Sequence, residues 1–266
     1  MKGIIGRQYP GERMVIIGED VIGSIVSFRE RPQSEWKAKN IIQGHMSFGL
    51  HRFMQPPFGY VTMLRKPLPR AVSDYAFVTS TPQHPIYQHV KDLSFSEYMS
   101  SNITGQLSNG QTRLLCGDCE DENFGAPTLR KLEREDFERA KNHLDQHFFA
   151  VGLQERFDES LILYKHKLGW KIPFYVSENI TKRPFTVANL TVEDNELINQ
   201  QNNFDLKLYD YVERRFENDM KKSGAKFQID LATFRILNRT FQAYVRARAR
   251  IGPVVRRIIP RPTSAA

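Results

Sequence analysis

Three short apolar runs stand out in the mixed pattern of hydrophobic and polar positions along the chain. They are "NIIQ" at residues 40–43, "FGYVTMLR" at 58–65 and "FFAVGLQ" at 148–154. Continuous apolar runs of this length, bounded by polar or turn-forming residues, are typical of buried strands. We therefore predict three buried strands at these positions.

Helical patterns follow two of these runs. Pro67 and Pro69 come directly after the second run, where a helix can begin because proline is tolerated in the first turn, and residues 70–78 supply a helical face. Residues 128–147 form a charged amphipathic helix, and a further helix is expected over 156–170. Its apolar side chains share one face: Phe157, Leu161, Tyr164 and Leu168. Alternating strands and helices predict an α/β fold with a parallel sheet covered on both sides.

Three other stretches are less regular. The first forty residues are ambiguous, with short apolar patches broken by glycine. Residues 81–130 are rich in serine, proline and glycine, and we expect a loop-rich insertion that contacts substrate. Residues 191–220 predict one or two further helices.

The overall composition indicates a soluble globular chain of 266 residues, with 40% hydrophobic and 26% charged residues. No apolar run approaches the roughly 18 residues that a membrane-spanning helix needs. The N-terminus lacks the basic, apolar and small-residue progression of a secretory leader. These features favour a cytoplasmic protein.

Positive charge is concentrated near the C-terminus of the chain, whose formal net charge is +8. Eight arginines lie there without one acidic residue among them: Arg235, Arg239, Arg246, Arg248, Arg250, Arg256, Arg257 and Arg261. Such a surface attracts polyanions of several kinds, including nucleic acids and acidic glycans. The alternative is a solvated terminal helix with a disordered tail.

The two cysteines, Cys116 and Cys119, have C-x-x-C spacing. A structural zinc needs four ligands, and the chain has no second pair of this kind. Two cysteines also exclude a fold held together by several disulfides. We interpret the pair as incidental and expect no metal.

Arg65 and Ser73 lie at a position suited to phosphate binding. Arg65 ends the second predicted strand, and ligands of parallel α/β sheets bind beyond the carboxyl ends of the strands. Its guanidinium offers a forked pair of donors, and the Ser73 hydroxyl on the following helix offers another. The alternative is an ion pair between Arg65 and a neighbouring acid.

His45 comes just after the first predicted strand, in "IIQGHMSFG". Histidine titrates near neutral pH, so at this edge of a sheet it can take a proton from a hydroxyl. The alternative is a hydrogen-bonded structural histidine.

Five segments in order resemble one family of enzymes. They are "IIQGHMSFGLHRF", "YVTMLRKPLPRAVSDY", "NGQTRLLCG", "FFAVGLQERFDESLILYKHKLGW" and "ENITKRP". In this order they are similar to the sulfotransferases that include heparan sulfate 2-O-sulfotransferase and its bacterial relatives. The resemblance covers the chain up to about residue 222 and implies a sulfotransferase-like domain over 1–222, followed by a basic C-terminal helix and tail over 223–266.

This resemblance implies a P-loop, nucleotide-kinase-like parallel sheet that binds 3′-phosphoadenosine 5′-phosphosulfate. The sulfuryl group would pass to a hydroxyl of a glycan or related acceptor, including acidic polysaccharides. Arg65 and Ser73 would hold the 3′-phosphate, Arg70 would have a structural role, and His45 would be the base. A late loop carrying Asn179 and Thr181 would close on the nucleotide.

The sequence departs from the family in one respect. Members open with a strand and a phosphate loop of the type P-K-T-G-G-T-S, and this sequence contains no such stretch. Residues 18–24, "GEDVIGS", copy the glycine spacing but lack the lysine. We therefore expect a sheet without its first strand and phosphate loop. That leaves a second hypothesis, a catalytically impaired nucleotide- or polyanion-binding protein. Nucleic-acid binding would rest on the arginine tail alone.

Overall fold

The computed structural model describes residues 1–9, 14–17, 21–36, 41–54, 56–117, 128–177 and 185–258. The strands are β1 (Met14–Ile16), β2 (Ile41–Gln43), β3 (Tyr60–Leu64) and β4 (Phe148–Leu153). The α-helices are α1 (Lys2–Gln8), α2 (Val21–Glu30), α3 (Gln33–Trp36), α4 (Pro67–Thr79), α5 (Tyr87–Val90), α6 (Phe95–Ser100), α7 (Gly110–Cys116), α8 (Arg134–His147), α9 (Phe157–Leu168), α10 (Val192–Gln201) and α11 (Asn203–Ile258). Short 3-10 turns are η2 (Leu50–Phe53), η3 (Gly105–Leu107), η4 (Gln154–Arg156) and η5 (Val187–Asn189).

The strands form two parallel pairs. In the described part of the chain β1 pairs with β2 and β3 pairs with β4. The register of the second pair shifts between Tyr60 and Val61 and is then regular to the carboxyl end, where Leu64 pairs with Leu153. The three predicted strands are confirmed within a residue or two of their expected limits, whereas β1 lies in the stretch that the sequence left ambiguous. The expected α/β class with parallel pairing is therefore confirmed.

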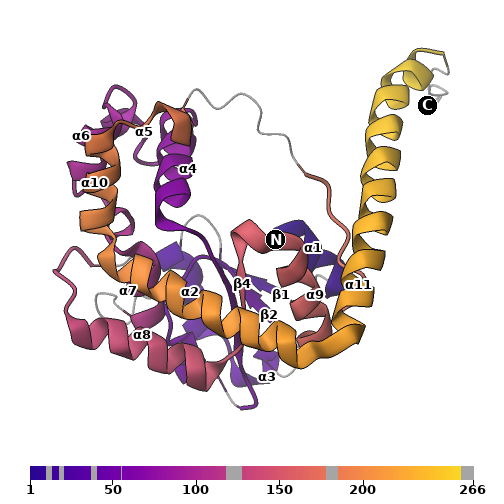
Figure 1. Ribbon diagram of the computed structural model, residues 1–266, viewed down its shortest axis with the longest axis horizontal. Helices are drawn as coiled ribbons and strands as arrows, with labels where there is room; N and C mark the ends of the chain where they lie inside the picture. Colours follow the sequence, from indigo (N-terminus) through magenta and orange to yellow (C-terminus); the bar gives the residue numbers. More distant parts are fainter. Residues whose placement is uncertain are drawn as a thin grey trace.

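Helices α9 and α11 pack with β4 in the largest hydrophobic cluster (Figure 1). Leu153, Leu161 and Leu208 are fully buried in it. The Tyr164 hydroxyl of α9 donates a hydrogen bond of 2.6 Å to the backbone carbonyl of Thr62 in β3. A Cβ on Gly152 would lie 2.5 Å from that hydroxyl, so β4 can approach α9 this closely only because the residue is glycine.

A second cluster joins α4, α5, α6 and α10, which lie together at one side of the molecule in Figure 1. Val90, Tyr98 and Ile198 are fully buried there. This corrects the expectation of a loop-rich segment over 81–130, because α5, α6 and α7 fall within it. Each of these helices has seven residues or fewer, which is too short to show a helical period in the sequence.

Helix α11 crosses the molecule and then changes direction at Gly224 (Figure 1). Gly224 has φ 63° and ψ −158°, a conformation that L residues with a side chain rarely adopt. Beyond it, Phe227, Leu231 and Phe234 remain buried, and the helix then extends away from the body. Two helical segments therefore meet at Gly224 within α11, and the second lies in the region where a C-terminal helix was expected from residue 223. No helix in the described ranges is both long and apolar enough to cross a membrane.

Candidate functional site

Arg65 follows the last paired residue of β3, Leu64, and its backbone is held by the side chain of Gln111. The backbone N–H of Arg65 donates to Gln111 Oε1 at 2.9 Å, and Gln111 Nε2 donates to the backbone carbonyl of Arg65 at 2.8 Å. The carboxamide therefore pairs with both backbone groups, as a neighbouring strand would. This fixes the backbone from which the half-buried guanidinium extends.

Gln111 is itself held by Asp205, a fully buried residue of α11. The Asp205 carboxylate accepts from the backbone N–H of Gln111 at 3.1 Å and from that of Thr112 at 2.7 Å. It also accepts from the Thr112 hydroxyl at 2.7 Å. These donors compensate the burial of the carboxylate and satisfy N–H groups of the first turn of α7.

Asn109, the residue before α7, in turn accepts hydrogen bonds from the start of α11. It has φ 51°, a left-handed conformation that asparagine tolerates better than most residues. Its Oδ1 accepts from the backbone N–H groups of Phe204 at 2.8 Å and Asp205 at 3.1 Å. Helices α7 and α11 therefore cap each other's N-termini through buried polar side chains.

Glu155 supports the adjacent position, just beyond β4. Its Oε1 accepts from the backbone N–H of Lys66 at 2.9 Å, and its Oε2 accepts from the Tyr209 hydroxyl at 2.9 Å. Burial, followed by the hydrogen bond to Glu155, raises the pKa of Tyr209, so the phenol stays protonated and donates. The ends of β3 and β4 are thus tied to α11 at two points.

Ser73 and Arg70 belong to α4, which begins with Pro67 at its first position as predicted. The Arg70 guanidinium donates to the backbone carbonyl of Gln106 at 2.9 Å and to its Oε1 at 2.6 Å. Arg70 therefore anchors α4 to the segment before α7, in agreement with the structural role expected for it. Ser73 is half-buried, one turn after Arg70 on the same helix.

His45 lies beyond β2 and is exposed. Gly44 before it is in close contact with Ile17, where a Cβ would lie 2.7 Å from the backbone carbonyl oxygen. Ser47 after it is fully buried, and among the described residues neither its Oγ nor the buried Oε1 of Gln43 has a hydrogen-bond partner. The imidazole is thus accessible, as a base for an incoming hydroxyl must be. Its strand belongs to a different pair from that of Arg65.

Several predicted features lie outside the described residues. These are Asn179 and Thr181, Cys119, and residues 18–20 of the glycine-spaced stretch. The remainder of that stretch, residues 21–24, begins α2. Cys116 is buried at the end of α7, within the segment 81–130 that was expected to be loop-rich.

Three other histidines gather around Phe48. The ring centroids of His51, His143 and His147 lie 5.0, 3.9 and 5.1 Å from that of Phe48. Burial lowers the pKa values of His51 and His143. In the described segments no group of three His, Cys, Asp or Glu side chains is placed to hold a metal ion. These rings therefore build an aromatic cluster around Phe48.

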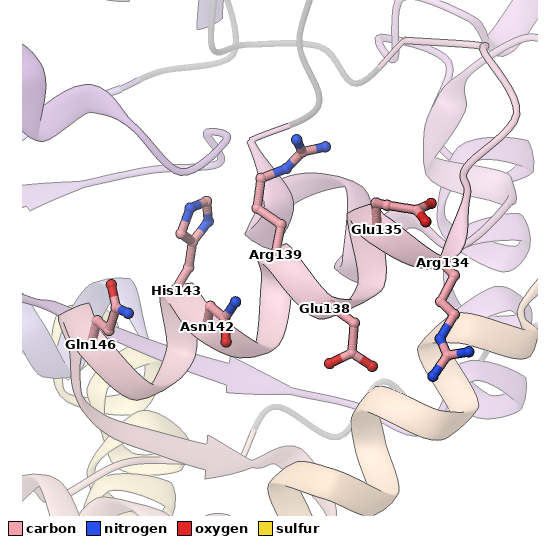
Figure 2. Close-up of a pocket in the computed structure, with 7 residues that line it drawn as sticks. All are labelled: Arg134, Glu135, Glu138, Arg139, Asn142, His143 and Gln146. Atoms are coloured by element: carbon pink, nitrogen blue, oxygen red, sulfur yellow. The ribbon is translucent and has the colours of Figure 1, made fainter.

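A hollow of about 490 Å³ lies along α8 and contains none of the predicted site residues (Figure 2). Its lining residues are Arg134, Glu135, Glu138, Arg139, Asn142, His143 and Gln146. In Figure 2, Arg139 and His143 project to one side of the helix and Glu138 to the other, so the side chains do not converge. We therefore place the candidate site at the strand ends.

Gln111, Asp205 and Glu155 were not among the site residues predicted from the sequence. Gln111 falls in "NGQTRLLCG", a segment that supports the family resemblance only through its order among the other motifs. Asp205 lies 94 residues away from Gln111, so nothing local marked the pair.

Comparison with known proteins identifies the family. The profile of the family described as galactose-3-O-sulfotransferase matches residues 27–245, well over half of the chain. Mouse galactose-3-O-sulfotransferase 2 is 24% identical over 186 residues, which are 66% of this chain and 45% of the mouse protein. The chain thus spans less than half the length of this curated relative.

The expectation of a sulfotransferase family is confirmed by these matches. The finer expectation is not supported, because they concern galactose-3-O-sulfotransferases and not heparan sulfate 2-O-sulfotransferase. The matched range includes β2, β3, α4, α7 and β4, and therefore the candidate residues His45, Arg65 and Ser73. The chain belongs to the galactose-3-O-sulfotransferase family.

Proposed function

We propose that this protein is a sulfotransferase that moves the sulfuryl group of 3′-phosphoadenosine 5′-phosphosulfate to a hydroxyl of a galactose-bearing glycan. The observation that carries the proposal is the family match over residues 27–245. The family description supports galactose as the acceptor sugar, and membership in a sulfotransferase family supports a sulfate donor of this kind.

In the proposed reaction His45 takes the proton of the acceptor hydroxyl as its oxygen attacks sulfur. The bond between sulfur and the bridging oxygen of the 5′-phosphate breaks, and adenosine 3′,5′-bisphosphate leaves. Arg65 and Ser73 hold the 3′-phosphate, while Asn179 and Thr181 contact the nucleotide. Sulfuryl transfer resembles phosphoryl transfer, so positioning and neutralisation of charge are the main contributions that the protein makes.

The residues at the end of β3 suit the donor. A guanidinium at the carboxyl edge of parallel strands offers a phosphate two N–H groups in a fixed geometry. Lys66 adds a second positive charge at the next position. The rigid backbone of Arg65 also favours binding, because little freedom is lost when the phosphate arrives.

A transfer assay tests the proposal. The full chain is incubated with donor labelled at the sulfuryl group and with oligosaccharides that end in galactose or, as a matched control, in glucose. A third arm uses heparan sulfate from which the 2-O-sulfate has been removed. We expect label on the galactose acceptor, and a His45→Ala variant should be slower by about 10²- to 10⁴-fold, the usual contribution of a general base. The exposed His89 of α5 provides the matched control, and His89→Ala should keep the wild-type rate.

Other outcomes would change the assignment. Label on heparan sulfate alone would move the acceptor to the class first expected from the sequence. Saturable binding of adenosine 3′,5′-bisphosphate without transfer to any acceptor would favour the nucleotide-binding hypothesis. Equal rates for wild type and His45→Ala would remove His45 from its role.

A further inference from the structure

We infer that Gln111, held by Asp205, is a positioning residue that sets the preference of this protein for a nucleotide with a 3′-phosphate. The inference rests on the proposed function, in which Arg65 binds that phosphate. It adds a residue that acts through Arg65 and that neither its sequence motif nor the family match assigns.

In the described part of the chain, the pairing of β3 with β4 ends just before Arg65. The register with β4 ends at Leu64, opposite Leu153. Beyond that pair, the two backbone groups of Arg65 are met by the Gln111 carboxamide at 2.9 and 2.8 Å. Two hydrogen bonds to one side chain restrict both backbone dihedrals of Arg65, and therefore the direction in which its side chain leaves the backbone.

Gln111 is itself held in place by its burial and by Asp205. Only 9% of its surface is exposed, and its backbone N–H donates to Asp205 Oδ2. Asp205 is fully buried and is fixed in turn by Thr112 through two hydrogen bonds of 2.7 Å. A continuous chain of contacts therefore runs from α11 through α7 to the backbone of Arg65.

The position of the Arg65 backbone affects the specificity for nucleotides with a 3′-phosphate. A forked guanidinium binds phosphate well only when its two N–H groups face the oxygens, so a small rotation of its backbone reduces the bidentate contact. Loss of the Gln111 contacts should weaken binding of the 3′-phosphate and leave the rest of the nucleotide site intact. A residue that merely stabilised the fold would weaken binding of every nucleotide alike.

Titration calorimetry of the full chain with two nucleotides tests the inference. Adenosine 3′,5′-bisphosphate carries the 3′-phosphate, and adenosine 5′-monophosphate lacks it. The main variant is Gln111→Met, which keeps the length of the side chain and removes both hydrogen bonds. The control is Gln201→Met, which removes a partly buried carboxamide bonded to the Met99 carbonyl, remote from Arg65 in sequence.

We expect the wild type to prefer the bisphosphate and Gln111→Met to lose about tenfold of that preference, equivalent to about 1.4 kcal/mol. The affinity for the monophosphate should stay the same, and Gln201→Met should behave as wild type. Should Gln111→Met melt below the assay temperature, Gln111→Asn, shorter by one methylene, carries the same comparison.

Two results would overturn the inference, and they can be told apart. If the wild type prefers the bisphosphate and the folded Gln111 variant keeps that preference, the positioning role fails and the proposed function stands. If the wild type shows no preference at all, the proposed 3′-phosphate site fails and the positioning role fails with it.

Discussion

The ends of β2 and β3 both carry a candidate site residue, but the surrounding protein supports them differently. At the end of β3, side chains from α7 and from η4, the turn that follows β4, accept hydrogen bonds from the backbone N–H groups of Arg65 and Lys66. At the end of β2, a three-residue strand, one buried polar atom each of Gln43 and Ser47 finds no hydrogen-bond partner in the described part of the chain.

This difference has a physical meaning. Arg65 would bind a group whose charge and shape are fixed, so a rigid backbone favours it. His45 would act as a base, for which access to the acceptor hydroxyl matters, and its side chain is exposed. Removal of polar contacts should therefore be costly at the β3 end and nearly neutral at the β2 end.

The largest effect is expected for Asp205→Ala. The change leaves the N–H groups of Gln111 and Thr112 and the Thr112 hydroxyl without their acceptor in a buried place. We expect the free energy of unfolding, measured with urea, to fall by about 3 kcal/mol. The exposed Asp210 on the same helix serves as the control, and its alanine variant should lie within about 0.5 kcal/mol of wild type. Equal losses in the two variants would refute the buried network.

The next largest effect on stability is expected at Asp136 of α8, a helix that packs against α7. Hydrogen bonds from Arg130 to Asp136, together with the backbone N–H of Glu133, lower the pKa of the Asp136 carboxyl to about 2. A depressed carboxyl pKa stabilises the fold fully above the unfolded value of about 3.8, and this stability is lost as the pH falls toward 2. It amounts to about 2 kcal/mol.

An Asp136→Asn variant gives the measurement for α8. Urea unfolding from pH 7 to pH 2 should show a weaker acid dependence in the variant than in wild type. An unchanged slope between pH 4 and pH 2 would contradict the role given to Asp136.

The β2 end has a steric test at Gly44. A Cβ there would lie 2.4 Å from the Cβ of Ile17, so Gly44→Ala should lower the free energy of unfolding by about 1–2 kcal/mol through overpacking. At Gly6 in α1, a Cβ would have no neighbouring atom within 4 Å in the part of the chain that the structure describes. Gly6→Ala should therefore raise the free energy of unfolding by up to about 1 kcal/mol, because alanine favours helix. Urea unfolding of both variants checks the opposite signs. The same sign in both would count against the packing at Gly44.

A pair of buried serines gives the smallest and most direct comparison. Ser160 accepts from the Leu153 backbone N–H at 2.8 Å and donates to its carbonyl at 2.9 Å, whereas the Ser47 hydroxyl has no partner within the ranges that the structure describes. By thermal unfolding, Ser160→Ala should cost about 1 kcal/mol, and Ser47→Ala should be neutral or slightly stabilising. A larger loss for Ser47→Ala would show that its hydroxyl has a partner in solution.

Much of the fold could be predicted from the sequence because its patterns are local. The apolar runs that became β2, β3 and β4 are short and bounded, and Pro67 marks the first turn of α4. The partners of the strands could not be read in this way, since Tyr60 of β3 pairs with Phe148 of β4 across a long stretch of chain. The helices α5 and α6 were missed because four to six residues show no period.

Only part of the candidate site could be predicted from the sequence. Arg65, Ser73 and His45 could be proposed from their places after predicted strands and from a family resemblance. The residues that support Arg65 could not be predicted in this way. Gln111 lies 46 residues after Arg65 in the sequence, and Asp205 lies 94 residues after Gln111. Contacts of this kind depend on how α7 and α11 meet, which no local pattern encodes.

The central claim is that Arg65 binds the 3′-phosphate of the donor nucleotide. Calorimetric titration of wild type and Arg65→Ala with adenosine 3′,5′-bisphosphate and adenosine 5′-monophosphate tests it most directly, with Arg239→Ala of the exposed face of α11 as control. We predict that Arg65→Ala loses about 10- to 100-fold in affinity for the bisphosphate, as expected for hydrogen bonds to a charged group, and little for the monophosphate. Unchanged discrimination in Arg65→Ala would contradict the claim.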